Sequence, residues 1–155
     1  MMNTRRIVTV LLATALILAM MPSCANELGS DPKAAVIAMF GAMEKDDRAT
    51  LAHILDLSEL MSNLNEDYAL QTNKPRVFTS PEQILDDLTG EGKTKKRWFD
   101  LQRIVNKAEV IGETATVEVT FVDKEQSRGW RTKFGLHKVH DQWKIYSFKT
   151  VVSEN

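Results

Sequence analysis

Cysteine is almost absent from this chain of 155 residues, in which Cys24 is the only one. An intramolecular disulfide is therefore excluded, and so is a catalytic or metal-binding cluster built from several cysteines. The sequence also contains no GxSxG, no HExxH and no phosphate-binding P-loop, which excludes the enzyme classes that depend on these motifs. We expect no cofactor and no bound metal, and the sequence indicates no catalytic residue.

An excess of charge of either sign is also missing. The chain has 20 Lys and Arg against 21 Asp and Glu, and residues 1–23 contribute Arg5 and Arg6 but no acid. The remainder therefore has 20 − 2 = 18 basic and 21 acidic side chains, a net charge near −3. Nucleic-acid-binding domains carry a strong positive field. We therefore expect no nucleic acid among the partners.

The one long apolar run lies near the start of the chain. Arg5 and Arg6 precede residues 7–21, which contain no charged side chain. As a helix this run would be roughly 22 Å long, shorter than the bilayer hydrocarbon core of about 30 Å. A basic start followed by such a run is typical of a secretory signal peptide rather than a transmembrane helix. The sequence therefore predicts that residues 1–23 direct export.

Cys24 follows this segment directly, in the sequence Met21-Pro22-Ser23-Cys24. These four residues resemble the lipobox of bacterial lipoproteins, which implies that Cys24 is lipidated and anchors the protein in a membrane. The competing interpretation is cleavage after Ala25, which would release a soluble secreted protein. Because an unpaired thiol is unfavourable in an oxidising compartment, we favour lipidation. Since residue 25 is not Asp, the same resemblance indicates the outer membrane, facing the periplasm, in a cell with two membranes.

Helical patterns dominate the sequence after the cysteine. Residues 24–31 are expected to form a short tether, and residues 32–155 are enough for one domain with a single core. Asp31-Pro32 and Ser80-Pro81 each combine a capping residue with a proline at the first helical position. Gln83 would complete a capping box. The expected helices cover about 32–45, a segment from Arg48 to Met61, and a segment from Pro81 to Leu88, with residues 62–79 loop-like.

Strand patterns occupy the second half of the chain. Val117, Val119 and Phe121 alternate with polar residues, as in a half-buried strand. Ile145 and Phe148 would lie on opposite faces of a regular strand, so either a bulge intervenes or both faces are covered. The sequence predicts an α+β fold, with N-terminal helices packed on a curved antiparallel sheet of about four strands. The strand-like runs are 98–111, 114–122, 130–139 and 143–152, joined by short turns into a meander.

Four segments together carry a resemblance to a known family: residues 43–47 (MEKDD), residues 51–55, the strand at 115–119 (ATVEV) and the closing residues 142–145 (QWKI). They resemble the nuclear transport factor 2-like (NTF2-like) superfamily, and in particular its small bacterial lipoproteins. The resemblance covers nearly the whole domain and implies a cone-shaped fold whose wide end can hold a small apolar ligand. The superfamily includes enzymes, binding proteins and interaction modules, so the fold alone does not choose among them.

An acid or base inside such a cone would indicate an enzyme. The candidate cavity residues are His53, Tyr68 and Tyr146, although a histidine without a partner is more often packed or exposed, and tyrosines commonly pack at the edge of a core. His137 and His140 should point to opposite faces of a regular strand, so we expect them to share no metal site.

Asp46 and Asp47 are spaced for helix capping rather than as an acid and base pair.

Four basic side chains cluster at Lys93, Lys95, Lys96 and Arg97. Such a run is most often a solvated loop. The alternative is contact with anionic envelope material, because a seven-residue tether reaches at most about 25 Å and would hold the domain near the membrane.

Two function classes remain open. The first, which we favour, is an envelope-anchored lipoprotein whose domain binds a small apolar ligand or an envelope protein without catalysis. The alternative is an isomerase-, dehydratase- or hydrolase-like enzyme with the cone as its active site. The lack of an evident acid and base constellation favours the first class.

Overall fold

The computed structural model describes residues 31–72 and 77–151. The predicted signal segment 1–23, Cys24 and nearly all of the tether lie outside the described residues. The helices are α2 (Pro32–Glu44), α3 (Arg48–Ile54), α4 (Leu57–Thr72), α5 (Pro81–Leu88) and α6 (Lys93–Phe99). The strands are β1 (Gln102–Ile111), β2 (Thr114–Asp123), β3 (Arg128–Val139) and β4 (Gln142–Val151). The predicted α+β order, helices first and strands second, is confirmed.

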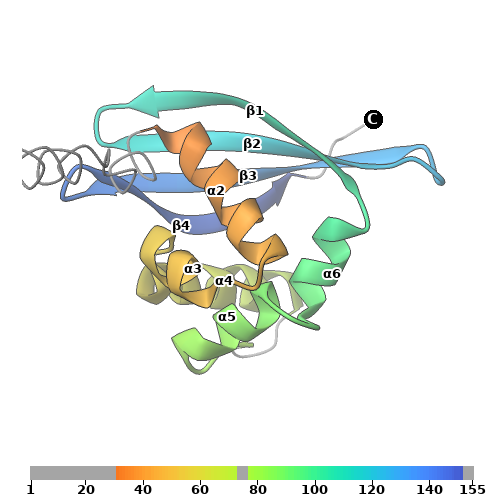
Figure 1. Ribbon diagram of the computed structural model, residues 1–155, viewed down its shortest axis with the longest axis horizontal. Coiled ribbons are helices and arrows are strands. Elements are labelled where there is room, and N and C mark those ends of the chain that lie inside the picture. The colour runs from red at the N-terminus through yellow and green to blue at the C-terminus, as the bar shows by residue number, and fades with distance from the viewer. Residues whose placement is uncertain (1–30, 73–76, 152–155) are drawn as a thin grey trace, which may run out of the picture.

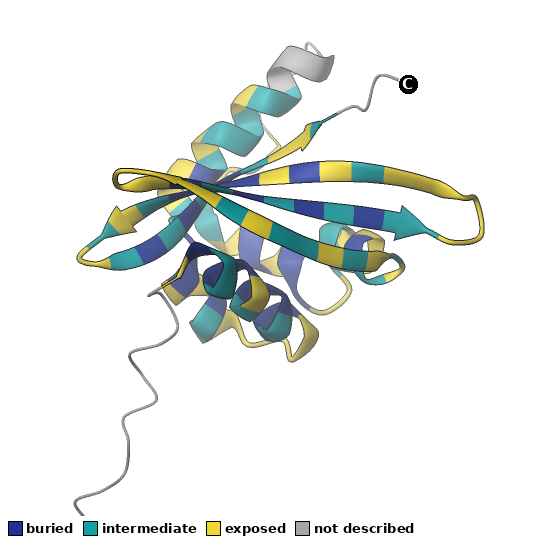
Figure 2. Ribbon diagram, turned by 90° about the horizontal axis from the view of Figure 1, so that it is seen from above, coloured by how far each residue is buried: buried dark blue, intermediate teal, exposed yellow. Residues whose placement is uncertain are grey.

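The four strands form one antiparallel meander in the order β1-β2-β3-β4. Figure 1 shows the helices against one side of this curved sheet, with α2 crossing it and α6 leading into β1. Buried and accessible residues alternate along the strands, as Figure 2 shows. None of the described helices has the length and apolar character needed to cross a membrane.

The core lies between the helices and the covered face of the sheet. Val117, Val119 and Phe121 are fully buried, as their alternation predicts. Among the described residues, every buried hydrophobic side chain lies between Ala35 and Ile145. A chain beginning at Ala25 therefore contains this entire core, and we expect residues 25–155 to fold without the preceding segment.

A bulge in β4 decides between the two alternatives left open for the last strand. Leu136 pairs with Ile145 and Phe134 pairs with Phe148, with a register shift between the two pairs. The extra residue returns Phe148 to the covered face, where its ring lies 5.1 Å from that of Phe134. Ile145 and Phe148 therefore share the covered face of the sheet.

The first helix begins and ends close to the predicted positions. Asp31 caps α2, because its Oδ1 accepts a hydrogen bond of 2.8 Å from the Ala34 amide. Val36, Phe40 and Met43 are buried, as their helical spacing predicts.

Helix α5 also begins at the predicted proline, but its cap differs from the prediction. Ser80 makes no side-chain capping bond. Instead Gln83 Oε1 accepts hydrogen bonds from the amide and hydroxyl of Thr79.

The prediction of a single helix from Arg48 to Met61 is wrong, because the helix is interrupted at Leu55. This residue is extended (φ −88°, ψ 139°) and forms an isolated parallel bridge with Ile145. The Asp56 amide then donates a hydrogen bond of 2.9 Å to the Ile145 carbonyl. The corner between α3 and α4 thus covers the open edge of β4, a contact that helical periodicity does not encode.

The prediction of a loop over 62–79 is wrong up to Thr72, where α4 ends. Asparagine is unfavourable in helices because its side chain forms hydrogen bonds with nearby backbone groups that compete with those of the helix. Here the asparagine side chains also form hydrogen bonds with backbone groups that are distant in the sequence. Asn63 Nδ2 donates to the Tyr146 carbonyl at 3.0 Å. Asn65 accepts from the Phe78 amide at 2.9 Å and donates to the Phe78 carbonyl at 2.8 Å. Residues 73–76 of this segment lie outside the described residues.

The basic segment after Gly92 is helix α6 rather than the predicted loop, and β1 begins at Gln102 instead of residue 98. Lysine and arginine are good helix formers, and Asp87 accepts a hydrogen bond of 3.2 Å from the Thr94 amide in the first turn. The helix buries Trp98, which is 7% exposed. A buried tryptophan on a helix therefore replaces the predicted start of a strand.

Candidate ligand-binding cavity

A cavity of about 550 Å³ opens between α4, α5, α6 and the adjoining ends of β3 and β4. This volume is within the range of small-molecule sites, which is roughly 300–1,000 Å³. Its apolar lining includes Leu64, Ile84, Leu88, Trp98 and Phe148. The predicted cone with room for a small ligand is therefore compatible with this geometry.

Trp98 is the most firmly held part of the cavity wall. Its ring stacks on Phe121 at 5.5 Å and meets Phe40, Phe134 and Phe148 at tilted or edge-on angles. Such aromatic pairs contribute beyond their buried area, by about 0.5–1.5 kcal/mol each. The wall is consequently preorganised and does not depend on a ligand for its shape.

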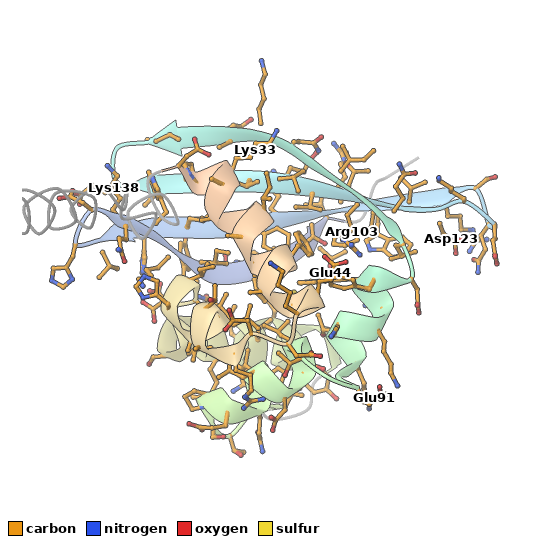
Figure 3. All side chains as sticks on the ribbon, viewed as in Figure 1. Lys33, Glu44, Glu91, Arg103, Asp123 and Lys138 are labelled. Atoms are coloured by element: carbon orange, nitrogen blue, oxygen red, sulfur yellow. The ribbon has the colours of Figure 1, made fainter. Side chains whose placement is uncertain are left out.

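Arg103 fixes α6 against α2 and was not indicated by any sequence pattern. Its guanidinium lies 3.9 Å from the centre of the Phe99 ring and donates a hydrogen bond of 2.8 Å to the Trp98 carbonyl. Burial lowers the pKa of Arg103, and the charge of Glu44 opposes this effect. Figure 3 shows Arg103 and Glu44 in the same corner, where α2, α6 and β1 meet. The contacts at this corner hold Trp98 in place on the side opposite the cavity.

Three basic side chains line the cavity: Lys93 and Arg97 from α6 and Lys149 from β4. Lys93 and Arg97 are four residues apart and therefore share one face of the helix. The Arg97 guanidinium also lies 5.6 Å from the centre of the Trp130 ring. Within the described part of the chain, none of the three forms an ion pair with an acid. Their charges remain available to a ligand.

Lys95 and Lys96 are directed elsewhere, so the predicted basic cluster divides into two pairs. Lys95 Nζ lies 2.6 Å from Asp46 Oδ1, which also accepts a hydrogen bond of 2.5 Å from the Gly90 amide. The hydrogen bonds from Lys95 and from Gly90 lower the pKa of Asp46. Lys96 pairs with Glu91. The Asp46 contacts tie the α2–α3 corner to α6, and both lysines lie outside the cavity lining.

The two neighbouring acids after α2 therefore have structural roles. Asp47 caps α3, because its Oδ1 accepts a hydrogen bond of 3.0 Å from the Thr50 amide. The predicted capping role of Asp47 is confirmed, whereas Asp46 ties distant corners together.

Of the three residues predicted for the cavity, only Tyr68 lines it. His53 is exposed on α3. Tyr146 stacks on His137 with ring centres 5.0 Å apart. Two acids, Asp67 and Asp87, also line the cavity, and Asp87 caps the first turn of α6 as described above.

The two strand-end histidines do not come together. His140 is an exposed turn residue with φ 50°, whereas His137 contacts Asp56.

Comparison with known proteins yields structural likenesses only. No family model and no curated protein matches the chain. A de novo designed protein with a curved β-sheet has a TM-score of 0.46 and 11% identity, covering 77% of this chain and 98% of its own. A protein named Rd1NTF2 has a TM-score of 0.47 and 13% identity, covering 76% and 93%.

A third likeness is to a protein named as an NTF2-like transpeptidase from Campylobacter jejuni. It has a TM-score of 0.40 and 13% identity, and the match covers 72% of this chain and 94% of that protein. At these values the likenesses concern the arrangement of elements and carry no argument about activity. The chain is an α+β domain, in which the helices precede an antiparallel sheet and a cavity lies between the two layers.

Proposed function

We propose that this domain binds, without catalysis, a small ligand that has an apolar body and an anionic group. The observation that carries the proposal is the combination of an apolar cavity lining with Lys93, Arg97 and Lys149 around it. Each methylene group buried against the lining contributes about 0.8 kcal/mol. A partly exposed ion pair adds at most about 1 kcal/mol. The apolar body therefore supplies most of the affinity, and the basic side chains select the charge of the ligand.

The lining supports binding better than acid–base chemistry. Asp87, one of the two acids of the lining, accepts a hydrogen bond from the Thr94 amide and so caps α6. His53 lies on α3, a helix that contributes no residue to the lining. An isomerase, dehydratase or hydrolase would need a positioned acid and base on one substrate. The enzyme alternative therefore has less support than the binding function.

Dodecanoate and dodecyltrimethylammonium are suitable probes, because they share the apolar chain and differ in the sign of the head group. We expect residues 25–155 to bind dodecanoate more tightly in isothermal titration calorimetry. The double variant K93S/R97S should weaken dodecanoate binding about tenfold, the equivalent of about 1.4 kcal/mol. It should bind the ammonium probe at least as tightly as the wild type does, because two like charges are removed.

The matched control is K95S/K96S, which removes the same charge from the same helix. Because Lys95 and Lys96 contact Asp46 and Glu91 outside the cavity, this variant should retain dodecanoate binding within about twofold. Equal losses in the two variants would refute the selective role of Lys93 and Arg97. If neither probe binds, the binding function itself is refuted.

We further propose that the domain is exported and anchored in the cell envelope through lipidated Cys24. The support is the sequence of residues 1–24, which lie outside the described residues. Metabolic labelling with a fatty-acid analogue should mark the wild-type chain and leave Cys24→Ser unlabelled. Label on both chains, or on neither, would contradict the anchor and favour a secreted protein. Contact of all four basic residues with anionic envelope material stays a prediction, although two of them are in ion pairs.

A further inference from the structure

Three side chains from distant parts of the sequence meet at the open edge of the sheet, outside the cavity. They are Asp56 and Glu59, at the start of α4, and His137 on β3. Asp56 Oδ2 lies 3.1 Å from Nε2 of His137, and Glu59 Oε2 lies 3.4 Å from its Nδ1. One nitrogen or oxygen atom from each residue lies within 4.8 Å of the other two. We call these three residues the edge cluster.

The edge cluster is built on fixed backbone. The Asp56 amide is held by the Ile145 carbonyl at 2.9 Å. Asp56 Oδ1 accepts a hydrogen bond of 3.2 Å from the Glu59 amide and so caps α4, which leaves Oδ2 directed toward the histidine. The His137 ring is stacked on Tyr146. A backbone amide thus orients the Asp56 carboxylate, and stacking on Tyr146 orients the His137 ring.

We propose that the edge cluster binds a divalent transition-metal cation of the zinc type. Zinc takes imidazole nitrogen and carboxylate oxygen at about 2.0–2.2 Å, so that tetrahedral neighbours are about 3.3 Å apart. The 3.1 Å between Asp56 Oδ2 and His137 Nε2 is close to this spacing, and Glu59 Oε2 lies 3.4 Å from the other ring nitrogen, Nδ1. Magnesium and calcium prefer sites made of oxygen ligands alone, so the histidine selects against them.

Glu59 is the residue that must move to complete the site, because it faces Nδ1 of His137 whereas Asp56 faces Nε2. Its side chain is 46% exposed, compared with 24% for His137 and 29% for Asp56. As the most exposed member of the cluster, it is the side chain that would turn toward the nitrogen that Asp56 already faces. The two carboxylates balance the charge of the cation, and the partly exposed position leaves room for water as a fourth ligand. Lys144, the nearby base, donates instead to the His53 carbonyl.

The test is calorimetric titration of residues 25–155, which contain no cysteine, with zinc chloride and separately with magnesium chloride. We expect one zinc ion per chain and no measurable heat from magnesium. H137A and E59Q should each weaken zinc binding at least tenfold. H53A and H140A, which remove the other two histidines, should bind zinc as the wild type does.

E59Q keeps the test valid if H137A folds poorly, because the Glu59 side chain is the most exposed of the three. A folded E59Q variant with wild-type zinc affinity would overturn the proposal. So would equal losses in H137A, H53A and H140A, since these indicate scattered surface binding. Absence of zinc binding to the wild-type chain would leave the edge cluster as an ion pair alone, and would also overturn it. None of these outcomes bears on ligand binding in the cavity.

Discussion

Replacing Trp98 with alanine should lower the free energy of unfolding by about 3–5 kcal/mol, the usual cost of removing a buried tryptophan. The side chain is 7% exposed and contacts four aromatic rings, those of Phe40, Phe121, Phe134 and Phe148. The surrounding rings come from α2, β2, β3 and β4, so they cannot all move inward to fill the space. Urea unfolding of residues 25–155, followed by far-ultraviolet circular dichroism, measures the change.

Trp130 provides the matched control, because it is the same residue type with less burial. Its ring is half-buried and stacks on Phe121 at 6.3 Å. We expect Trp130→Ala to cost about 1–2 kcal/mol, in proportion to the smaller apolar area that it buries. Equal destabilisation by the two substitutions would show that the four ring contacts of Trp98 add little to stability. Trp98→Ala should also weaken dodecanoate binding, because it removes part of the cavity wall.

Replacing Gly92 with alanine should destabilise the domain by about 1–3 kcal/mol, the usual cost of forcing atoms into filled space. A Cβ atom at this position would overlap the backbone carbonyl of Asp87 and approach that of Asp86. Because both neighbours are backbone, α6 would have to move away from α5. Lys93 and Arg97 lie on α6, so the variant should lose both stability and dodecanoate affinity in the same unfolding and calorimetric measurements.

Gly41→Ala is the control for this substitution. Gly41 lies within α2, and an added Cβ would meet no atom within 4 Å beyond the backbone of its own helix. Removing glycine from a helix interior stabilises by about 0.5–1 kcal/mol when the new side chain meets nothing. We therefore expect Gly92→Ala to lower the free energy of unfolding and Gly41→Ala to raise it. A Gly92→Ala variant as stable as the wild type would show that α6 can shift freely, and that the cavity wall is less rigid than the structure indicates.

Local patterns were sufficient for several features that depend on near neighbours. The Asp31-Pro32 pair correctly predicted the start of α2, because a helix cap involves residues within one turn. Alternation correctly predicted the buried face of β2, because successive side chains of a strand point to opposite faces. The antiparallel meander followed in the same way, since short turns leave adjacent strands few other ways to pair.

Two of the errors arose where distant backbone competes with local preference. Leu55 fits a helical pattern, yet it pairs with Ile145, ninety residues further along the chain. Asn63 and Asn65 resemble loop residues, yet each binds a carbonyl from another segment. Intrinsic propensities differ by less than about 1 kcal/mol per residue, so one or two such hydrogen bonds can reverse them.

By itself, the sequence determined the α+β class, the order of the strands and the expectation of an exported, anchored chain. Only the tertiary structure decided which residues form the sites. It separated Lys93 and Arg97 from Lys95 and Lys96, and it brought Asp56 within 3.1 Å of His137, 81 positions away. The physical reason is one of range: caps and periodicity concern residues within a turn or a strand, whereas cavities and clusters depend on how whole elements pack.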